Sequence, residues 1–184
     1  MPLPSTHALV PIAAAIAISP RPVPWRLITV AVVAAMLPDL DGLSHHLFGV
    51  SNSSIFSHRG MAHSLLVALT VGAMAAAFHR SLGVRYVTAA VVIALAMASH
   101  GLLDMMTDSG KPVAYLWPLT PTRLFEIWRP IHSMDVHRRH FFEVSGARLW
   151  SELRQVIVPL MLAAIAFRMA RLRLAKASAW RQSR

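Results

Sequence analysis

The chain has 184 residues, of which 55% are hydrophobic and 14% are charged, and it carries a formal net charge of +10. A typical soluble domain has about 25% charged residues, so this composition excludes an ordinary soluble fold and predicts a membrane protein. The length predicts a single membrane-embedded domain over 1–184, with a core at 4–174 and a basic cytoplasmic tail at 175–184.

Five apolar blocks predict an all-α fold, a polytopic membrane helical bundle of about five membrane helices. The first two blocks are shorter than the roughly 20 residues that a span needs, so we expect a helical hairpin packed against longer neighbours. Pro159 predicts a kink in the last block. Between blocks, 39–60 is expected to be a polar loop, and 111–148, with Trp117 and Trp128, an interfacial segment at the outer face. The blocks lie at 8–18, 25–37, 61–78, 84–106 and 153–169.

Basic residues lie mainly at the ends of the apolar blocks. Arg21 and Arg26 lie near the junction of the first two blocks, Arg80 and Arg85 follow the third, and the tail is basic, so all fall on one side of a five-span topology. The positive-inside rule makes that side cytoplasmic and the N-terminus external. The 16 Arg and 2 Lys form no interleaved basic and aromatic face, so we expect membrane headgroups and no nucleic acid as partners. The sequence carries no signal for an oligomeric state.

One pair of polar residues lies inside the longest apolar block. His100 and Asp104 are four residues apart, so on a helix they share one face. An imidazole and a carboxylate beside hydrocarbon are costly unless they are compensated, and one bound cation compensates both. The alternative is a hydrogen-bonded structural pair between helices. We favour a metal site, built without thiolate ligands because the chain has no cysteine.

Two upstream stretches supply further candidate ligands. In PDLDG, Asp39 and Asp41 are alternate residues that point at one cation or bridge two, the alternative being a polar helix stop. In HRGMAHS, His58 and His63 are candidate ligands, and Arg59 is suited to bind an anionic substrate oxygen through paired hydrogen bonds. The alternative for this stretch is a set of interfacial histidines with an ordinary positive flank.

The five-span topology brings these residues to one membrane face, which is the strongest reason to expect a single site. Arg123 and Arg129 are candidates for binding a phosphate or headgroup, together with Arg59. Weaker candidates, expected to be interfacial, structural or supporting, are His45, His46, His79, Asp108, Glu126, His132, His137, His140 and Glu143. The predicted metal ligands are His7, Asp39, Asp41, His58, His63, His100 and Asp104.

The order of these stretches carries a family resemblance. The series TH, PDLDG, HRGMAHS, HGLLDMMTDSG and WPLTP resembles the membrane-bound metal-dependent hydrolase family whose best-known member is a LexA-regulated inner-membrane protein. The likeness covers roughly the first two-thirds of the chain and implies a hydrolase of the bacterial inner membrane, without naming a substrate. The H-x-x-x-D spacing also has a looser likeness to zinc-dependent phospholipase C. The residues that match the family's motifs are Asp39, Asp41, His58, His63, His100 and Asp104.

The favoured function is a metal-dependent hydrolase that directs a metal-activated water at a lipid ester or phosphoester at the outer face of the inner membrane. The chain has neither a cysteine nor a nucleophilic-serine elbow. Asp39 or Asp41 is the expected general base or bridging ligand, with Arg59 as a further catalytic residue. Zinc is the expected cofactor, and manganese and magnesium are alternatives. The alternative function is a non-enzymatic metal-binding scaffold or ion carrier, whereas the absence of HExxH disfavours an intramembrane metalloprotease.

Overall fold

The computed structural model describes residues 4–19, 22–108, 110–131 and 146–182. Within these ranges the regular secondary structure is helical, and extended backbone pairs only at two isolated bridges. The predicted all-α class is confirmed for this part of the chain. The elements are α1 (Pro4–Ile18), α2 (Trp25–Met36), the 3-10 helix η1 (Leu37–Leu43), α3 (Ser44–Phe48), the 3-10 helix η2 (Met61–His63), α4 (Leu65–Ala77), α5 (Tyr86–Met105), α6 (Gly146–Glu152), the π-helical turn η3 (Leu153–Ile157) and α7 (Val158–Gln182).

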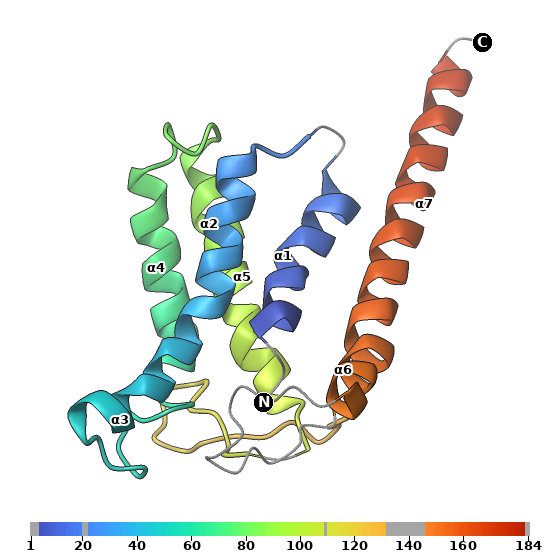
Figure 1. The fold of residues 1–184 in the computed structure, drawn as a ribbon. Coiled ribbons are helices and arrows are strands. Elements are labelled where there is room, and N and C mark those ends of the chain that lie inside the picture. Colours follow the sequence, from blue (N-terminus) through green and yellow to red (C-terminus); the bar gives the residue numbers. More distant parts are fainter. Residues whose placement is uncertain (1–3, 20–21, 109, 132–145, 183–184) are drawn as a thin grey trace.

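The long helices stand side by side and run alternately up and down (Figure 1). α5 lies in the middle and contacts α1, α2 and α4, while α7 packs on α1. The start of α1, the end of α2, the start of α4 and the end of α5 therefore share one end of the bundle (Figure 1). We call this the lower end, as it is drawn.

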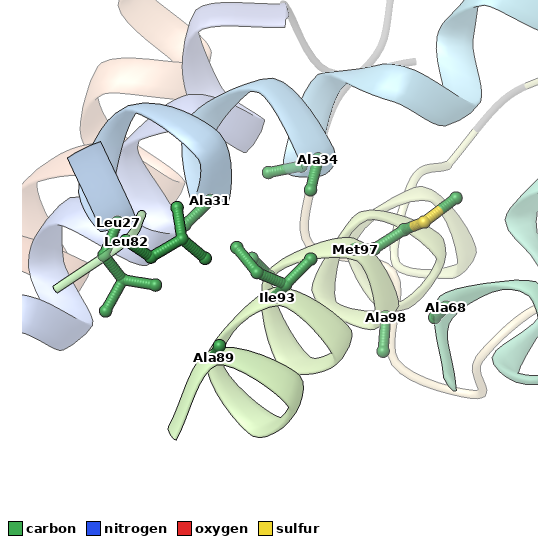
Figure 2. Close-up of a cluster of buried hydrophobic side chains, with 11 residues drawn as sticks. Leu27, Ala31, Ala34, Ala68, Leu82, Ala89, Ile93, Met97 and Ala98 are labelled. Carbon is green, nitrogen blue, oxygen red and sulfur yellow. The ribbon is translucent and has the colours of Figure 1, made fainter. Parts of the chain in front are cut away.

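The helices pack through small side chains. Gly72 of α4 lies so close to α5 that an added Cβ would be 2.5 Å from the carbonyl oxygen of Ala90. Helices in a membrane gain stability from close van der Waals contact, which small residues permit. The buried core shown in Figure 2 is accordingly dominated by alanine, with a few larger side chains filling the gaps: Leu27, Ala31, Ala34, Ala35, Ala68, Leu82, Ala89, Ile93, Ala96, Met97 and Ala98.

Large apolar side chains lie on the outside of the bundle. Val33, Leu69, Leu95 and Phe167, on four different helices, are each more than half exposed. An exterior of this kind is suited to hydrocarbon and not to water. Two stretches, Tyr86–Met105 and Leu149–Ala175, are long and apolar enough to cross a membrane, while Ser5–Ile18 and Leu65–Ala77 are shorter apolar helices.

The prediction of a polar loop over 39–60 is wrong for the first part of this range, which is helical. η1 continues directly from α2, and α3 follows it and ends at Gly49, whose φ is 62°. Pro38 suits the start of η1 because the first turn of a helix leaves its N–H groups unbonded in any case. Asp39 and Asp41 are therefore held by helical backbone.

The last predicted block, 153–169, is longer in the structure. α7 runs to Gln182, so the predicted tail from 175 to 182 is helical. The irregularity expected at Pro159 takes the form of the π-helical turn η3 immediately before it. Proline has no N–H to bond back to the preceding turn, which favours such a local widening.

The described part of the predicted interfacial segment crosses the lower end of the bundle. Residues 110–131 are irregular, with bridges from Val113 to Leu124 and from Thr107 to Ile131. The segment is tied to the bundle by a hydrogen bond from Leu65 N to the Tyr115 carbonyl at 2.9 Å. Its location at a membrane interface stays a prediction, and 132–145 lie outside the described residues.

Candidate metal centre

α5 carries two residues of the centre into the interior. His100 and Asp104 are both fully buried. Gly101 lets α5 approach its neighbours, because a Cβ there would lie 2.7 Å from the His63 carbonyl oxygen and 2.8 Å from the Tyr115 ring. At this level α5 therefore packs directly on the backbone of His63 and on the ring of Tyr115.

A tight turn positions the HRG stretch. Arg59 has a φ of 63°, and Gly60 N donates to the Ser57 carbonyl at 2.8 Å. A Cβ on Gly60 would lie 1.9 Å from the Ile55 carbonyl oxygen, so only glycine fits. This turn fixes the direction in which the chain enters η2 and thus the place of His63.

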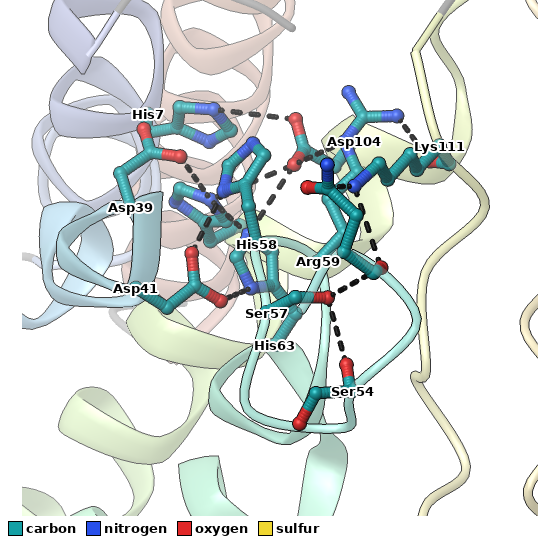
Figure 3. Close-up of polar contacts among 12 residues, drawn as sticks. His7, Asp39, Asp41, Ser54, Ser57, His58, Arg59, His63, Asp104 and Lys111 are labelled. Atoms are coloured by element: carbon teal, nitrogen blue, oxygen red, sulfur yellow. Dashed lines mark hydrogen bonds and ion pairs between the residues drawn. The ribbon is translucent and has the colours of Figure 1, made fainter. Parts of the chain in front are cut away.

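α4 begins one turn later than predicted. Block three was expected to start at 61, but Ser64 is extended, with ψ 151°, and its Oγ accepts a hydrogen bond from Val67 N at 3.3 Å. This N-cap separates η2 from α4. His63 is consequently the last residue of η2 and points across the bundle toward α5 (Figure 3).

Two imidazoles face each other at the middle of the cluster. His100 Nδ1 donates to the Ala35 carbonyl at 2.7 Å, and His63 Nδ1 lies 3.1 Å from Asp41 Oδ2. With the Nδ1 atoms directed at acceptors, each ring turns its Nε2 inward, and the two Nε2 atoms are 3.2 Å apart. Two lone pairs at this distance repel each other unless a proton or a metal cation lies between them.

Two carboxylates converge on the same point. Asp104 Oδ2 lies 3.4 Å from His63 Nε2, and Asp39 Oδ1 lies 3.4 Å from His100 Nε2. The four ligand atoms lie within 4.8 Å of one another. Zinc bonds of about 2.0–2.1 Å place neighbouring ligand atoms of a tetrahedron about 3.3 Å apart. The separations of 3.2, 3.4 and 3.4 Å are close to this value, whereas His100 Nε2 and Asp104 Oδ2 are 3.8 Å apart. None of the four carboxylate oxygens accepts a well-formed hydrogen bond from a described residue.

Asp41 supports the cluster from η1. Its Oδ1 is hydrogen-bonded to His58 Nδ1 at 2.7 Å, and its Oδ2 lies 3.1 Å from His63 Nδ1 (Figure 3). Burial alone would lower the pKa of His63, but Asp104 and Asp41 outweigh it and raise that pKa to about 9. A carboxylate behind a histidine is the usual arrangement for orienting a metal ligand. Asp41, His58 and His63 also form a second group close enough to hold an ion.

Arg59 lies behind Asp104 in the interior. Its Nε is 3.1 Å from Asp104 Oδ2, and its Nη atoms donate to the Lys111 carbonyl at 2.6 Å and to Thr107 Oγ1 at 3.1 Å. The side chain is only 2% exposed. The structure thus makes Arg59 a positioning residue for Asp104, and its predicted contact with substrate stays a prediction.

His7 lies beside the four-ligand group without belonging to it. Its ring stacks on that of His100, with centroids 3.7 Å apart, and its Nε2 is 3.8 Å from Asp104 Oδ1. The residue is fully buried, and neither ring nitrogen has a hydrogen-bond partner among the described residues. A bound cation near Asp104 is the kind of partner that this ring lacks.

A buried glutamate beside the start of α1 was missed by the sequence analysis. Thr6 Oγ1 donates to Glu152 Oε2, and both residues are almost completely buried. This contact joins α6 to the start of α1. The sequence held one signal that could have found Glu152. It is a lone acidic residue just before an apolar block, and a carboxylate placed there is costly unless it has a partner.

The two other predicted substrate arginines lie apart from the cluster. Arg123 donates to the Ser54 carbonyl at 2.8 Å and to the His58 carbonyl at 3.4 Å, so it braces the loop that carries His58. Arg129 lies at the surface with its guanidinium 4.9 Å from the Phe125 ring centroid.

The weaker candidates do not join the cluster. His45 Nδ1 donates to the Val50 carbonyl at 2.9 Å, and His79 Nδ1 donates to the Val84 carbonyl at 3.1 Å at the opposite end of the bundle. Asp108 and Glu126 are exposed. The side chain of His46 lies outside the described part of the structure. Four further candidates lie outside the described residues altogether: His132, His137, His140 and Glu143.

The net charge of the cluster suits a divalent cation. Three carboxylates, those of Asp39, Asp41 and Asp104, lie with one guanidinium, that of Arg59, so the group carries a net charge of −2 when its imidazoles are neutral. A buried net charge is costly unless it is neutralised. A proton on His63 would remove half of this charge, whereas one divalent ion would remove all of it. The residues present therefore fit a metal ion.

A helical bundle with an apolar exterior, as the described residues form, is typical of an integral membrane protein. The chain belongs to the YdjM inner membrane protein family, whose model matches residues 1–176. It is 34% identical over 168 residues to the inner membrane protein YbcI of Escherichia coli K12, an alignment that covers 88% of this chain and 94% of YbcI. It is 33% identical over 103 residues to YdjM of the same organism, which covers 51% of this chain and 50% of YdjM. No solved structure matches the chain. The predicted inner-membrane class is confirmed.

Proposed function

We propose that this protein is a membrane-embedded metal-dependent hydrolase that acts on a lipid ester or phosphoester at the outer face of the inner membrane. The observation that carries the proposal is the 3.2 Å approach of His63 Nε2 to His100 Nε2, with oxygens of Asp39 and Asp104 directed at the same point. Two nitrogen and two oxygen donors without a thiolate favour zinc, with manganese and magnesium as alternatives.

A divalent ion held by these four residues, with a water as a further ligand, would supply two things, a nucleophile of lowered pKa and polarisation of the scissile group. The protein supplies the geometry. Arg59 holds Asp104 in place, and Asp41 holds the rings of His58 and His63. These contacts fix the ligands before substrate arrives, which is what an efficient site requires.

Asp39 is the residue we assign as general base. One of its oxygens faces His100, and both are without a well-formed hydrogen bond from any described residue. Its side chain is 11% exposed, whereas His100 and Asp104 are completely buried. Asp39 thus lies at the accessible edge of the cluster, where it can accept a proton from the attacking water.

We assign the centre to the outer face of the membrane. The support is the opposite end of the bundle, where Arg26, Arg80 and Arg85 lie in or beside the turns, as the positive-inside rule expects of the cytoplasmic side. A green fluorescent reporter fused after Arg184 should fluoresce in the cytoplasm, and an alkaline phosphatase fused there should be inactive. Phosphatase activity at that position would reverse the assignment.

Hydrolysis by purified protein tests the activity. Detergent-purified wild type, stripped with a chelator and reloaded with zinc, should cleave at least one member of a panel of phospholipids, aryl phosphodiesters and carboxyl esters. Asp39→Asn should lower kcat by about 100-fold or more, because it removes the base and a ligand oxygen. The matched control, Asp108→Asn, changes an exposed aspartate and should stay within about twofold of wild type. A zinc-loaded wild type that cleaves no member of the panel would contradict the hydrolase.

A metal-stabilised scaffold is the second candidate. The observation in its favour is burial: His7, His63, His100 and Asp104 are at most 2% exposed, and together they tie α1, η2 and α5 to one another. On this alternative, metal removal lowers the unfolding temperature and no substrate is turned over. The hydrolysis panel, run beside a thermal unfolding scan, separates the two.

A further inference from the structure

A cavity separate from the metal centre lies between α1, α2 and α5. Its volume is about 410 Å³, and among the residues that the structure describes its lining is apolar except for Ser19 and Thr88. Protein interiors are close-packed and hold few voids larger than a water molecule, so a space of this size needs an occupant. Because apolar walls offer water no hydrogen bonds, the occupant must be apolar as well.

The cavity leads to the metal centre. Val10, which lines it, is three residues after His7 on α1, and Ala96, which lines it on α5, is four residues before His100. One helical turn therefore separates the lower end of the cavity from the cluster on both helices. From Val10 the lining continues along α1 to Ile18, a rise of about 12 Å. The cavity is thus a groove that runs along the bundle away from the centre.

The groove opens sideways, toward the surroundings of the bundle. Ala14, Thr88 and Leu95 line it and are themselves exposed, Leu95 to 64%. In an inner membrane protein, exposed apolar side chains at this level of the helices face lipid chains. A chain of a neighbouring lipid can enter the groove without passing through water.

We propose that the groove binds one acyl chain of a glycerophospholipid whose headgroup lies at the metal centre. The inference rests on the proposed function and names the substrate class of that site. A cavity of about 150 Å³ holds one benzene, so 410 Å³ holds about sixteen non-hydrogen atoms, the size of a single acyl chain. A polyprenyl chain of many isoprene units is too large for it.

Photolabelling locates the chain directly. The protein is reconstituted in vesicles of phosphatidylethanolamine and phosphatidylglycerol that contain a phosphatidylglycerol with a diazirine on one acyl chain, and labelled peptides are mapped by mass spectrometry. In wild type the label should concentrate on the groove segments 10–19, 22–31 and 84–96. Label spread evenly over the lipid-facing side of α4 as well would overturn the proposal.

A matched pair of variants and two competitors sharpen the result. Ala14→Trp fills the groove from its exposed mouth and should lower groove labelling about tenfold, whereas Ala73→Trp, at an exposed alanine of α4, should leave it within about twofold. Equal labelling in the two variants would overturn the proposal, since label would then not depend on the groove. Unlabelled phosphatidylglycerol should compete better than a long polyprenyl phosphate, and the reverse order would overturn the acyl assignment.

The metal centre is tested separately from the groove. Hydrolysis of the same panel is measured beside labelling in wild type and in Ala14→Trp, which changes the groove and leaves the residues of the cluster unaltered. Groove labelling without hydrolysis in any protein would leave the acyl site standing and remove the enzyme. Hydrolysis in wild type without groove labelling would support the enzyme and overturn the acyl site.

Discussion

Asp104→Asn is expected to weaken zinc binding by at least about a hundredfold. The substitution removes a charged ligand oxygen that lies 3.4 Å from His63 Nε2 and 3.8 Å from His100 Nε2, and it keeps the shape of the side chain. Competition with a chromogenic chelator, on detergent-purified protein, measures the change. An affinity equal to that of wild type would remove Asp104 from the ligand set.

The same variant should also destabilise the metal-free protein. Asp104 is the ion-pair partner of the buried Arg59, at 3.1 Å, and breaking such a pair leaves a buried charge uncompensated, a cost of about 3–5 kcal/mol. Asp39→Asn offers a comparison, because Asp39 has no arginine partner among the described contacts. It should lose zinc with little change in metal-free stability. Asp108→Asn, one turn further along the chain and exposed, is the neutral control for both measurements.

Gly60→Ala is expected to lower the free energy of unfolding by about 3 kcal/mol and to reduce zinc occupancy. An added Cβ would lie 1.9 Å from the Ile55 carbonyl oxygen and 2.6 Å from that of Ser57, both of them backbone atoms. The turn must therefore open, which moves Arg59 and His63 on either side of it. Chemical unfolding in mixed micelles and elemental analysis measure the two effects.

Gly146→Ala is the matched control for that substitution. No heavy atom of the described residues lies within 4 Å of a Cβ added there, so stability and zinc content should stay at the values of wild type. A Gly60→Ala protein as stable as Gly146→Ala, with full zinc, would show that the turn tolerates a side chain and that the site does not depend on its geometry.

Much of the arrangement followed from the order of apolar blocks. Because successive helices of a bundle with short connections alternate in direction, residues at the start of α1 and α4 and at the end of α2 and α5 must share one end. Asp39, His63, His100 and Asp104 come from three of these four places, and the structure gathers them within 4.8 Å. The i and i+4 spacing of His100 and Asp104 placed both on one face of α5.

Other features of the site depend on tertiary packing, and no periodic pattern in the sequence predicted them. PDLDG contains proline and glycine, which are typical of loops, yet the chain continues as η1 and aims Asp39 and Asp41 inward. Arg59 follows a histidine in a polar stretch, and nothing in that pattern indicated that a φ of 63° would turn it toward Asp104. Glu152 becomes part of the interior only because α6 docks on the start of α1.

The metal content of the purified wild-type protein tests the central claim most directly. Elemental analysis after detergent purification, and again after incubation with zinc, manganese or magnesium and removal of free ion, should find about one divalent ion per chain, held by the four-ligand group. Asp104→Asn prepared in parallel should hold almost none. Wild-type protein that binds none of these ions would contradict the account, and the facing imidazoles of His63 and His100 would then be held by a shared proton alone.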